Sequence, residues 1–405
     1  MHGDIMKEVD ILVIGAGPIG GYFSKQMSKL GCKILMIEEH SEIGKPFQCA
    51  GLVNPSSMEK VGLYDTVLSE IDGAIMHSPY GTTIEIGKAN QIRTYAVCRK
   101  KFDQAIVQQA MDEGAELWLN SKPIDTNYVD DFIITEILVD GEIKEVKAKL
   151  LVGADGAHSW VRRQHRMGYP KEFMIGYQVE VTGFQTKDRM LEMFTGEDIA
   201  PGFFAWAIPN GDTHRIGMWS RAEDLDGRSC EELLNNLMTK SRWANKFENC
   251  KEIGKFCGPI PAGVVPRPVQ DRVLLIGDAA GLAKPTTGGG IGPGMAQVDL
   301  IAEELNQMVV KNKLAKKILI KVTKKYAKAK KEFERIRSLR DFFVTSRTDE
   351  ELEEIFKIFS KPEVIKLINE KGDIEKPLAL GISMLKNVPE FRKMAIKAGF
   401  IVMFG

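Results

Sequence analysis

The sequence predicts an α/β protein in three parts: a discontinuous domain built on a parallel sheet, an antiparallel β domain and a helical C-terminal region. Two glycine-rich turns, one near residue 15 and one near residue 288, each follow an apolar strand pattern and precede a helical pattern. Between them, residues 172–258 hold a series of short strand patterns that would pair as a meander. After residue 310 the pattern is helical.

Size and composition limit the class of protein. At 405 residues the chain exceeds the size at which one core stops growing, so two or three domains are expected. Its 55 basic and 55 acidic residues cancel, which removes an overall field that would attract nucleic acid. The six cysteines show no C-x-x-C pair and are expected to be free thiols. No apolar run is long enough to span a bilayer, so we expect a cytoplasmic protein whose membrane contact, if any, is peripheral and on the inner face.

The first glycine-rich turn has the context of a dinucleotide site. An apolar strand over residues 9–14 runs into a G-x-G-x-x-G turn, and a helix comes next. In such a turn Gly15 makes the tight bend, Gly17 lets the backbone approach a pyrophosphate, and Gly20 lets the helix pack on the strand. A second strand ends in Glu38, the acid expected to bind a ribose hydroxyl. The alternative is a strand-to-helix turn without a ligand.

The second glycine-rich turn lies in residues 272–295. A buried strand over residues 273–276 leads to Asp278, and three successive glycines, Gly288 to Gly290, allow close backbone approach to a ligand. A helix is expected from about Pro293, and its first free N–H groups would favour a negatively charged group. Taken alone, this stretch also fits a glycine-rich turn that binds nothing.

The string GDAAGLAKPTTGGGI in this turn resembles the second flavin motif of the FAD-dependent hydroxylase and geranylgeranyl reductase superfamily, and is close to the geranylgeranyl reductase form. The resemblance implies that Asp278 hydrogen-bonds the ribityl chain of FAD and that the helix start lies near its pyrophosphate and isoalloxazine. It also implies a Rossmann-like FAD-binding domain like those of p-hydroxybenzoate hydroxylase and glutathione reductase. No second G-x-G-x-x-G has a strand and a helix around it, so one dinucleotide is expected.

Three further segments resemble the same superfamily. PFQCAG resembles the P-x-x-C-G segment that places a cysteine near the flavin ring, with Ala50 where the family has glycine; Cys49 as a small buried apolar residue is the alternative. Arg99 opens an R-x-x-F-D segment whose arginine contacts FAD, and GADGAHSWVR resembles a D-G motif that shapes the site. The FAD contacts implied are Gly15, Gly17, Ile19, Gly20, Glu38, Cys49, Ala50, Arg99, Asp278, Gly288, Gly289, Gly290 and Ile291.

The antiparallel part holds a candidate substrate wall. Alternation places Phe204, Trp206 and Ile208 on one face of a strand, which suits a hydrocarbon chain, although packing in the core is an equal alternative. The segment continues through Pro209 and resembles the Y-x-W-x-F-P-K-G motif of geranylgeranyl reductases, with Asn210 in place of lysine. It also resembles the W-x-W-x-I-P motif of flavin halogenases, but lacks the first tryptophan.

The C-terminal region changes in composition. Residues 311–340 are rich in lysine and arginine on a helical pattern, which suits either an anionic membrane surface or a solvated face. Residues 349–405 are expected to be helical with breaks at Pro362, Pro377 and Pro389. The apolar tail, residues 395–404, would cap a pocket or touch lipid.

The chain is identified as a member of the geranylgeranyl reductase family, which implies an FAD-dependent reductase that saturates isolated double bonds of prenyl chains, as in archaeal ether lipids. Its electrons would come from NAD(P)H bound transiently or from a reduced protein carrier. Cys49 or a water on the Gly288 to Gly290 backbone would supply the proton. The alternatives are a flavin monooxygenase or halogenase on the same scaffold, and a non-catalytic prenyl carrier.

Domain boundaries follow from this interpretation. The FAD-binding domain would comprise residues 1–72, 98–171 and 258–310, and the antiparallel substrate domain residues 73–97 and 172–257. The helical region would cover residues 311–405.

Overall fold

The computed structural model describes residues 6–46, 49–345, 347–372 and 377–393. Its first sheet has the strand order β17-β18-β11-β1-β2-β8, with parallel pairing of β1 to both β2 and β11 and of β11 to β18. A hairpin, β9 and β10, extends β11 by antiparallel pairing. The strands of this sheet are β1 (Lys7–Ile14), β2 (Ile34–Ile37), β8 (Glu116–Trp118), β9 (Ser121–Val129), β10 (Phe132–Val139), β11 (Glu142–Gly153), β17 (Val269–Gln270) and β18 (Val273–Leu275).

Helices cover this sheet because its central strands are apolar on both faces. All four residues of β2 and the last four of β1 are buried, as parallel strands that are covered on both faces require. α1 packs against α3 and α6, which together form one layer. These helices are α1 (Pro18–Lys29), α3 (Arg99–Asp112) and α6 (Ile291–Val310), and the shorter α4 (Trp160–Gln164) packs on β11.

The second sheet has seven strands in the order β16-β12-β15-β14-β13-β5-β6. All its pairs are antiparallel except that between β13 and β5. α5 (Cys230–Thr239) packs on β12 and β15. The strands are β5 (Gly73–His77), β6 (Thr83–Gly87), β12 (Glu172–Thr182), β13 (Met190–Phe194), β14 (Ala205–Asn210), β15 (Thr213–Arg221) and β16 (Lys251–Ala262).

A small third sheet, in the order β3-β7-β4, connects the two larger ones. β7 and β4 contact β14 of the second sheet, and α2 next to β3 contacts α6. Its elements are β3 (Leu52–Val53), β4 (Val67–Ile71), β7 (Thr94–Val97) and the neighbouring α2 (Pro55–Val61). The sequence pattern did not predict this sheet, because two-residue β3 is too short to show a period.

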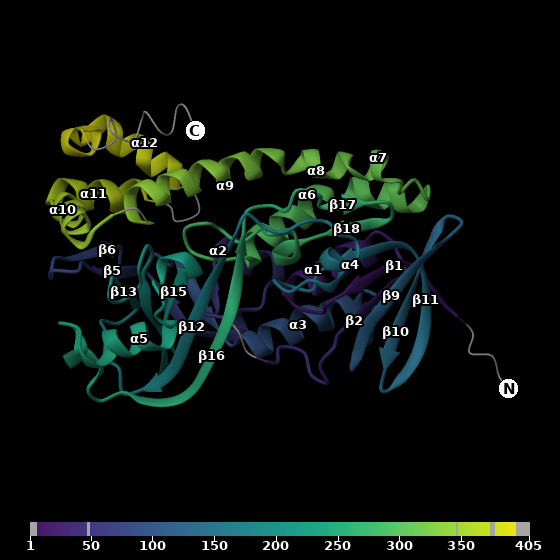
Figure 1. The fold of residues 1–405 in the computed structure, drawn as a ribbon, viewed down its shortest axis with the longest axis horizontal. Coiled ribbons are helices and arrows are strands. Elements are labelled where there is room, and N and C mark those ends of the chain that lie inside the picture. The colour runs from purple at the N-terminus through teal and green to yellow at the C-terminus, as the bar shows by residue number, and fades with distance from the viewer. Residues whose placement is uncertain (1–5, 47–48, 346, 373–376, 394–405) are drawn as a thin grey trace.

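The C-terminal helices lie along one side of the molecule (Figure 1). α8 packs on α6 and on α9, while α10 and α11 pack on β6. α10 is tied to the β5–β6 turn by Glu353, whose carboxylate accepts hydrogen bonds from Ser78 and Thr82. These helices are α7 (Lys316–Leu319), α8 (Lys321–Lys325), α9 (Ala327–Arg340), α10 (Asp349–Phe359), α11 (Pro362–Lys371) and α12 (Pro377–Asn387).

The α/β class and the helical C-terminal region are confirmed. Two boundaries differ from expectation: α6 begins at Ile291 rather than near Pro293, and β14 begins at Ala205, so Phe204 precedes the strand. Pro362 and Pro377 begin helices, since proline is accepted in a first helical turn. The expected apolar tail lies outside the described residues. We propose the domain boundaries given above as the division of the chain, except that β16 runs through residue 258 and so extends the antiparallel domain to Ala262.

A helix that crosses a bilayer needs about 20 predominantly apolar residues. Among the described residues, no helix combines the length and apolar character that crossing a bilayer requires.

Candidate functional site

The first glycine-rich turn is shaped for close backbone contact. Gly15 has φ +97°, and a Cβ there would lie 2.7 Å from the carbonyl oxygen of Ala154. A Cβ at Gly20 would lie 2.0 Å from the carbonyl oxygen of Gly15, so the helix can approach the turn only with glycine. Gly17 differs, because nothing lies within 4 Å of its Cβ position. Gly17 therefore borders open space, where a bound group can approach the backbone.

Two helices start at the glycine-rich turns with free N–H groups. The N-caps of α1 and α6 are Gly17 and Gly290, neither of which provides a capping side chain. Neither helix has an acidic residue in its first turn. Both N-termini are therefore open to a phosphate group.

Ile19 joins the two turns. Its side chain lies 3.2 Å from the Cβ position of Gly277 and 2.7 Å from that of Gly294 in α6. The two glycine-rich segments, more than 250 residues apart in the sequence, thus meet through one aliphatic side chain. Ile291, at the start of α6, is buried in the same core.

Glu38 follows the end of β2, beside the first turn. One carboxylate oxygen accepts a hydrogen bond from the Ala16 N–H at 3.1 Å, and the other lies 2.6 Å from His40 Nδ1. Glu38 is therefore positioned beside the backbone that would carry the pyrophosphate, as a ribose-binding acid requires.

Asp278 lies in a short 3₁₀ turn, Gly277–Ala280, immediately after β18. Burial raises the pKa of its carboxyl group to about 6, although the nearby Arg99 acts in the opposite direction. Within the described part of the chain, the carboxylate has no hydrogen-bond partner. A Cβ at Gly290 would lie 2.3 Å from Asp278 Oδ1, so the glycine leaves the carboxylate room. An acceptor held in this way needs a donor from a ligand.

The glycines after Asp278 bring the loop against the second sheet. Gly288 has φ +68°, and a Cβ there would lie 3.2 Å from Trp219 and 3.4 Å from Ile260. The loop is closed by hydrogen bonds from the Gly288 N–H to the Lys284 carbonyl and from the Lys284 N–H to the Gly289 carbonyl. The expected flavin loop therefore borders Trp219 and Ile260 of the antiparallel sheet.

Arg99 begins α3 and forms a two-pronged ion pair with Asp103, with N···O distances of 3.1 and 2.9 Å. Burial opposes the charge of Arg99, but the carboxylate of Asp103 and the sulfur of Cys49 outweigh it and hold the pKa above its usual value. The positive charge of Arg99 also favours the ionised form of Asp278 and so partly offsets the effect of burial on its pKa. It is thus the charged group that connects the Cys49 segment to the second glycine-rich turn.

Cys49 lies beside two guanidinium groups, one of which sequence reasoning missed. Its sulfur accepts a hydrogen bond from the Gly51 N–H at 3.3 Å and interacts with both Arg99 and Arg215. Arg215 is only 3% exposed and donates to the carbonyl of Ala50 at 2.9 Å. No local signal marked Arg215, because it follows Thr213 and His214 in β15 and the carbonyl that it binds, that of Ala50, is far away in the chain.

The expected substrate wall divides into two parts. Phe204 and Trp206 are half-buried, with ring centroids 6.3 Å apart, and Phe204 also lies 5.6 Å from Trp219. Ile208 is 2% exposed and packs in a core cluster with Ile71. The accessible aromatic surface is therefore formed by Phe204 and Trp206.

Pro209 is the remaining residue of the expected wall. It is half-buried on β14, where it is paired with His214 of β15.

The D-G segment connects the first and second turns. Asp155 Oδ2 accepts from the Val161 N–H at 3.1 Å, while its buried Oδ1 has no partner. Burial raises the pKa of Asp155. Arg162 donates to the carbonyl of Ala279 at 3.2 Å and to that of Ala157 at 2.6 Å, which ties this segment to the turn that contains Asp278.

The chain is similar in sequence to FAD-binding proteins and to several reductases. The FAD-binding domain family matches residues 8–315. A digeranylgeranylglycerophospholipid reductase of Methanosphaera stadtmanae is 30% identical over 383 residues, which cover 89% of this chain and 93% of the relative. The chain belongs to the geranylgeranyl reductase family. A second reductase of this family, from Methanosarcina acetivorans, is 32% identical over 301 residues, covering 71% of this chain and 72% of the relative.

Solved structures confirm the fold of this geranylgeranyl reductase family member. A geranylgeranyl bacteriochlorophyll reductase-like protein from Thermoplasma acidophilum superimposes with a TM-score of 0.85 at 21% identity, covering 97% of this chain and all of that chain. The flavin-dependent brominase Bmp2 superimposes with a TM-score of 0.71 at 18% identity, covering 90% and 94% of the two chains. The scaffold is thus shared by flavoproteins of different chemistry.

The family cofactor, FAD, fits the residues that the structure brings together. Asp278 offers an unpaired carboxylate and Asp155 an unpaired buried oxygen, while Gly17 borders open space. Two open helix N-termini supply N–H donors for a pyrophosphate. In the described residues, no cluster of histidine, cysteine, aspartate or glutamate could hold a metal ion.

Proposed function

We propose that this protein is an FAD-dependent reductase that saturates isolated carbon–carbon double bonds in the geranylgeranyl chains of glycerophospholipids. One structural observation carries the proposal: the flavin loop at Gly288 lies directly against Trp219, which packs on the half-buried Phe204. An apolar chain lying on this aromatic surface would therefore be next to the cofactor. The curated relatives named above are digeranylgeranylglycerophospholipid reductases, which supports the choice of substrate.

The reaction assigns separate tasks to cofactor and protein. FAD held by these residues would, when reduced, supply the hydride for one alkene carbon. An isolated alkene has no carbonyl that polarises it, so the protein must deliver a proton to the other carbon and exclude water from the site. Phe204 and Trp206 provide the apolar surface, and the buried Trp219 packs behind Phe204. We propose as FAD contacts the residues that the family resemblance implies, from Gly15 to Ile291. We propose Phe204, Trp206 and Pro209 as substrate contacts, while Ile208, which is 2% exposed, would support them from the core.

Cys49 is the proposed proton donor, and a water molecule bound to the backbone of Gly288 to Gly290 is the alternative donor. If the thiol donates, Cys49→Ala should lower the rate of prenyl reduction at least about 100-fold, the usual range for a general acid, while FAD stays bound. Cys49→Ser, which keeps a donor of similar size, should recover part of the rate. Single-turnover kinetics of the pre-reduced protein measure this step. An unchanged rate in Cys49→Ala would assign the proton to water.

The source of electrons and the membrane contact complete the proposal. A nicotinamide cofactor bound transiently, or a reduced protein carrier, would reduce the flavin, since the chain has one dinucleotide turn of the G-x-G-x-x-G type. The basic region from residue 311 to 340 would hold the protein at the inner face of the membrane, where its lipid substrate lies.

An anaerobic experiment tests the function. The purified protein is reduced with dithionite, a geranylgeranyl glycerophospholipid is added, and flavin reoxidation and product mass are followed together. Reoxidation with mass rising in steps of two hydrogens is the expected result. Flavin that stays reduced with the lipid, but reoxidises in air to give an oxygenated or halogenated product, would favour a monooxygenase or halogenase. A colourless protein that still binds prenyl groups would indicate a carrier.

A further inference from the structure

One face of β15 contacts three parts of the proposed site. Alternate residues of a strand point to the same face, so Arg215, Gly217 and Trp219 lie in a row, roughly 7 Å from one to the next. Trp219 lies 3.2 Å from the Cβ position of Gly288 in the flavin loop. Trp206 of β14 is paired with Gly217 and lies over it, since a Cβ at Gly217 would come within 2.5 Å of the indole ring. The strand therefore holds the flavin loop and the aromatic surface side by side.

Arg215 brings a third part, the segment over residues 49–51, to the same strand. Its guanidinium group donates to the carbonyl of Ala50 at 2.9 Å and to that of Val97 at 3.4 Å. Gly51 has φ +77°, and a Cβ there would lie 2.0 Å from Arg215 Nη1, so only glycine leaves room for the guanidinium group. Arg215 is 3% exposed, so these hydrogen bonds are shielded from water.

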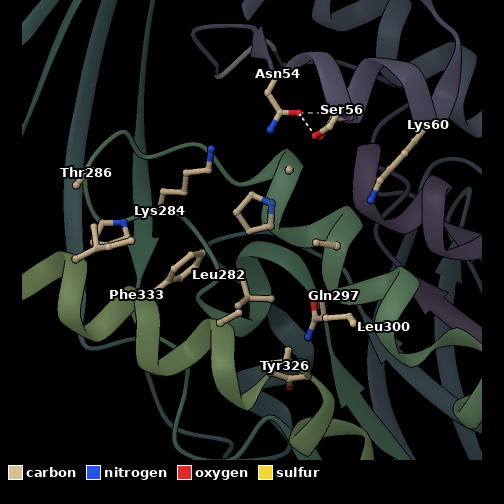
Figure 2. A pocket seen from close by; sticks show the side chains of 17 residues that line it. Asn54, Ser56, Lys60, Leu282, Lys284, Thr286, Gln297, Leu300, Tyr326 and Phe333 are labelled. Atoms are coloured by element: carbon tan, nitrogen blue, oxygen red, sulfur yellow. Dashed lines mark hydrogen bonds between the residues drawn. The ribbon is translucent and has the colours of Figure 1, made fainter. Parts of the chain in front are cut away.

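The far end of this segment is fixed by another element. From Gly51 the chain runs through β3 to Asn54, the N-cap of α2. A Cβ at Gly292 of α6 would lie 2.9 Å from Asn54 Nδ2, so α2 begins in close contact with α6. Figure 2 shows Asn54 and its hydrogen bond from Ser56 beside a pocket of about 220 Å³ that α2 and α6 border. The contact with α6 fixes the end that is remote from Cys49, and the end that carries Cys49 needs a contact of its own.

The contact with Arg215 also places Cys49 next to the proposed substrate surface. Ala50 and Trp206 pack against the same buried cluster, which contains Ile208. The Cys49 sulfur accepts a hydrogen bond from the Gly51 N–H at 3.3 Å, which keeps the thiol close to its own backbone. The position of this short segment therefore sets the distance between the thiol and an alkene that lies on Trp206.

Charged groups from three elements surround Cys49. Arg99 of α3 interacts with the sulfur and is paired with Asp103. Arg215 of β15 also interacts with the sulfur, and Glu180 of β12 acts on the charge of Arg215. Because each of the two cations has a carboxylate near it, the contribution of Arg215 is one of position more than of net charge.

We propose that Arg215 is a positioning residue, which holds the thiol of Cys49 against the alkene that lies on Trp206. The S–H bond of Cys49 breaks as one alkene carbon takes the proton, the other carbon takes the hydride from reduced flavin, and water returns a proton to the thiolate. Both electrons therefore come from the flavin. This inference rests on the proposed function, because it takes Cys49 as the proton donor.

The kinetic test compares substitutions of Arg215 in the FAD-loaded protein, with rates expressed per bound flavin and a geranylgeranyl glycerophospholipid as substrate. Arg215→Met removes the hydrogen bonds and keeps an apolar side chain. A misplacement of about 1 Å can slow a reaction about 100-fold, so we expect kcat to fall at least about 30-fold while KM stays within about threefold. Arg215→Lys keeps the charge and one donor and should recover part of kcat.

Arg272→Met is the matched control. Arg272 is also buried, at 7% exposed, and donates to a backbone carbonyl, that of Lys149, at 3.1 Å. It lies at the turn between β17 and β18 and has no role in the proposed site. Both kcat and KM of this variant should stay close to those of the wild type. A loss of kcat in Arg272→Met as large as that in Arg215→Met would reduce the effect to a general loss of stability and would overturn the inference.

A double variant shows whether Arg215 acts through Cys49. If it does, Arg215→Met should lower kcat by less than about twofold when Cys49→Ala is already present, because the group that it positions is gone. Losses that multiply would show that the two residues act independently, which contradicts a positioning role. An unchanged kcat in Arg215→Met, or a change in KM alone, would contradict it as well.

A second measurement does not depend on activity. In the flavin-free protein at about pH 10, where free thiols are ionised, iodoacetamide alkylates a cysteine at a rate that accessibility sets. Mass spectrometry of the peptide that contains Cys49 should show at least about fivefold faster alkylation in Arg215→Met, since the segment is released. The buried Cys32 is the internal reference and should react at an unchanged rate. Equal rates at Cys49 in variant and wild type, or faster rates at both cysteines, would overturn the inference.

The two measurements separate this inference from the proposed function. If the wild type reduces no prenyl lipid, but alkylation of Cys49 alone is faster in Arg215→Met, the proposed reaction fails and Arg215 remains the residue that positions Cys49. If the wild type and Cys49→Ala reduce the lipid equally fast, the reaction stands and the inference fails, because the thiol is then not the donor.

Discussion

At the scale of single residues, the site depends on where side chains are absent. Gly290 lies against the carboxylate of Asp278, and a Cβ there would come within 2.3 Å of it. Gly290→Ala must therefore displace Asp278 or the start of α6, and we expect FAD affinity to fall at least tenfold. Gly254→Ala in β16 is the control, because nothing lies within 4 Å of its Cβ position and it is not among the proposed FAD contacts. Flavin retained after gel filtration measures both, and equal retention would contradict the prediction.

The buried carboxyl group of Asp278 should make the stability difference between the wild type and Asp278→Asn depend on pH. Burial raises the pKa of its carboxyl group from 3.8 to about 6, so the folded flavin-free protein binds this proton more tightly than the unfolded chain does. The stabilisation from this group is present below pH 3.8 and is lost as the pH rises to about 6. The amide in Asp278→Asn stays neutral at every pH, so the variant does not lose this stabilisation as the pH rises. At about 1.4 kcal/mol per pH unit, the flavin-free variant should exceed the wild type by up to about 3 kcal/mol at pH 8.

Urea unfolding of the flavin-free proteins between pH 4 and pH 8 measures this difference. The advantage of Asp278→Asn should vanish near pH 4, where the wild-type carboxyl group is also neutral. An advantage that is the same at every pH would show that packing, rather than charge, sets the cost. The same variant should bind FAD more weakly, since the amide replaces a carboxylate acceptor.

Sequence reasoning reached the local residues of the site but not their long-range partners. The glycines, Glu38 and Asp278 follow from local context, because each turn is formed by neighbouring residues. Arg215 and Arg340 could not be identified, since the carbonyls that they bind, those of Ala50 and Pro285, lie more than 50 residues away in the chain. Alternation along the strand predicted that Ile208 would share the exposed face of Phe204 and Trp206. The third sheet covers Ile208 and places it in the core. That sheet could not be predicted, because it left no clear period in the sequence.

At the scale of elements, α9 is the part that ties the C-terminal region to the flavin loop. Arg340, at its end, donates to the carbonyl of Pro285 at 2.7 Å and forms a two-pronged pair with Glu172 of β12. Its guanidinium also lies 4.9 Å from the centroid of Phe203. One buried side chain therefore connects a helix, the second sheet and the loop that precedes Gly288.

Replacement of Arg340 by lysine should loosen this connection. Lysine keeps the charge but cannot form the two-pronged pair and reach the Pro285 carbonyl at once, so we expect a loss of about 2–4 kcal/mol in unfolding free energy and faster release of FAD. Arg335→Lys, on the exposed face of the same helix, should change stability by less than about 0.5 kcal/mol. Denaturant unfolding and stopped-flow flavin release measure the two effects. Matching behaviour of the two variants would refute this role for Arg340.

At the scale of the whole molecule, the basic region does not behave as an inserting membrane helix. Its apolar residues Leu319, Val322 and Tyr326 are buried in the core of the FAD-binding part, so they are not available to lipid. The lysines of the opposite face are exposed. Amphipathic periodicity in the sequence indicated the helices correctly, but it could not tell whether the apolar face meets lipid or protein, because both bury it equally.

Membrane contact through this region must therefore be electrostatic, and it should respond to salt and to charge. Each lysine near an anionic surface contributes about 1 kcal/mol, so the triple variant Lys321→Glu, Lys324→Glu and Lys328→Glu should weaken binding to vesicles of anionic lipid at least 100-fold. Sedimentation with vesicles measures the bound fraction. Wild-type binding should disappear between about 0.1 and 0.5 M salt, as the screening length shortens. The matched triple change of Lys88, Lys122 and Lys144 to glutamate should leave vesicle binding within a few-fold of the wild type, because these exposed or partly exposed lysines lie outside the basic region.

Vesicle binding that withstands both salt and the triple change within the basic region would exclude this face as the membrane contact. The assignment of the flavin site would be unaffected.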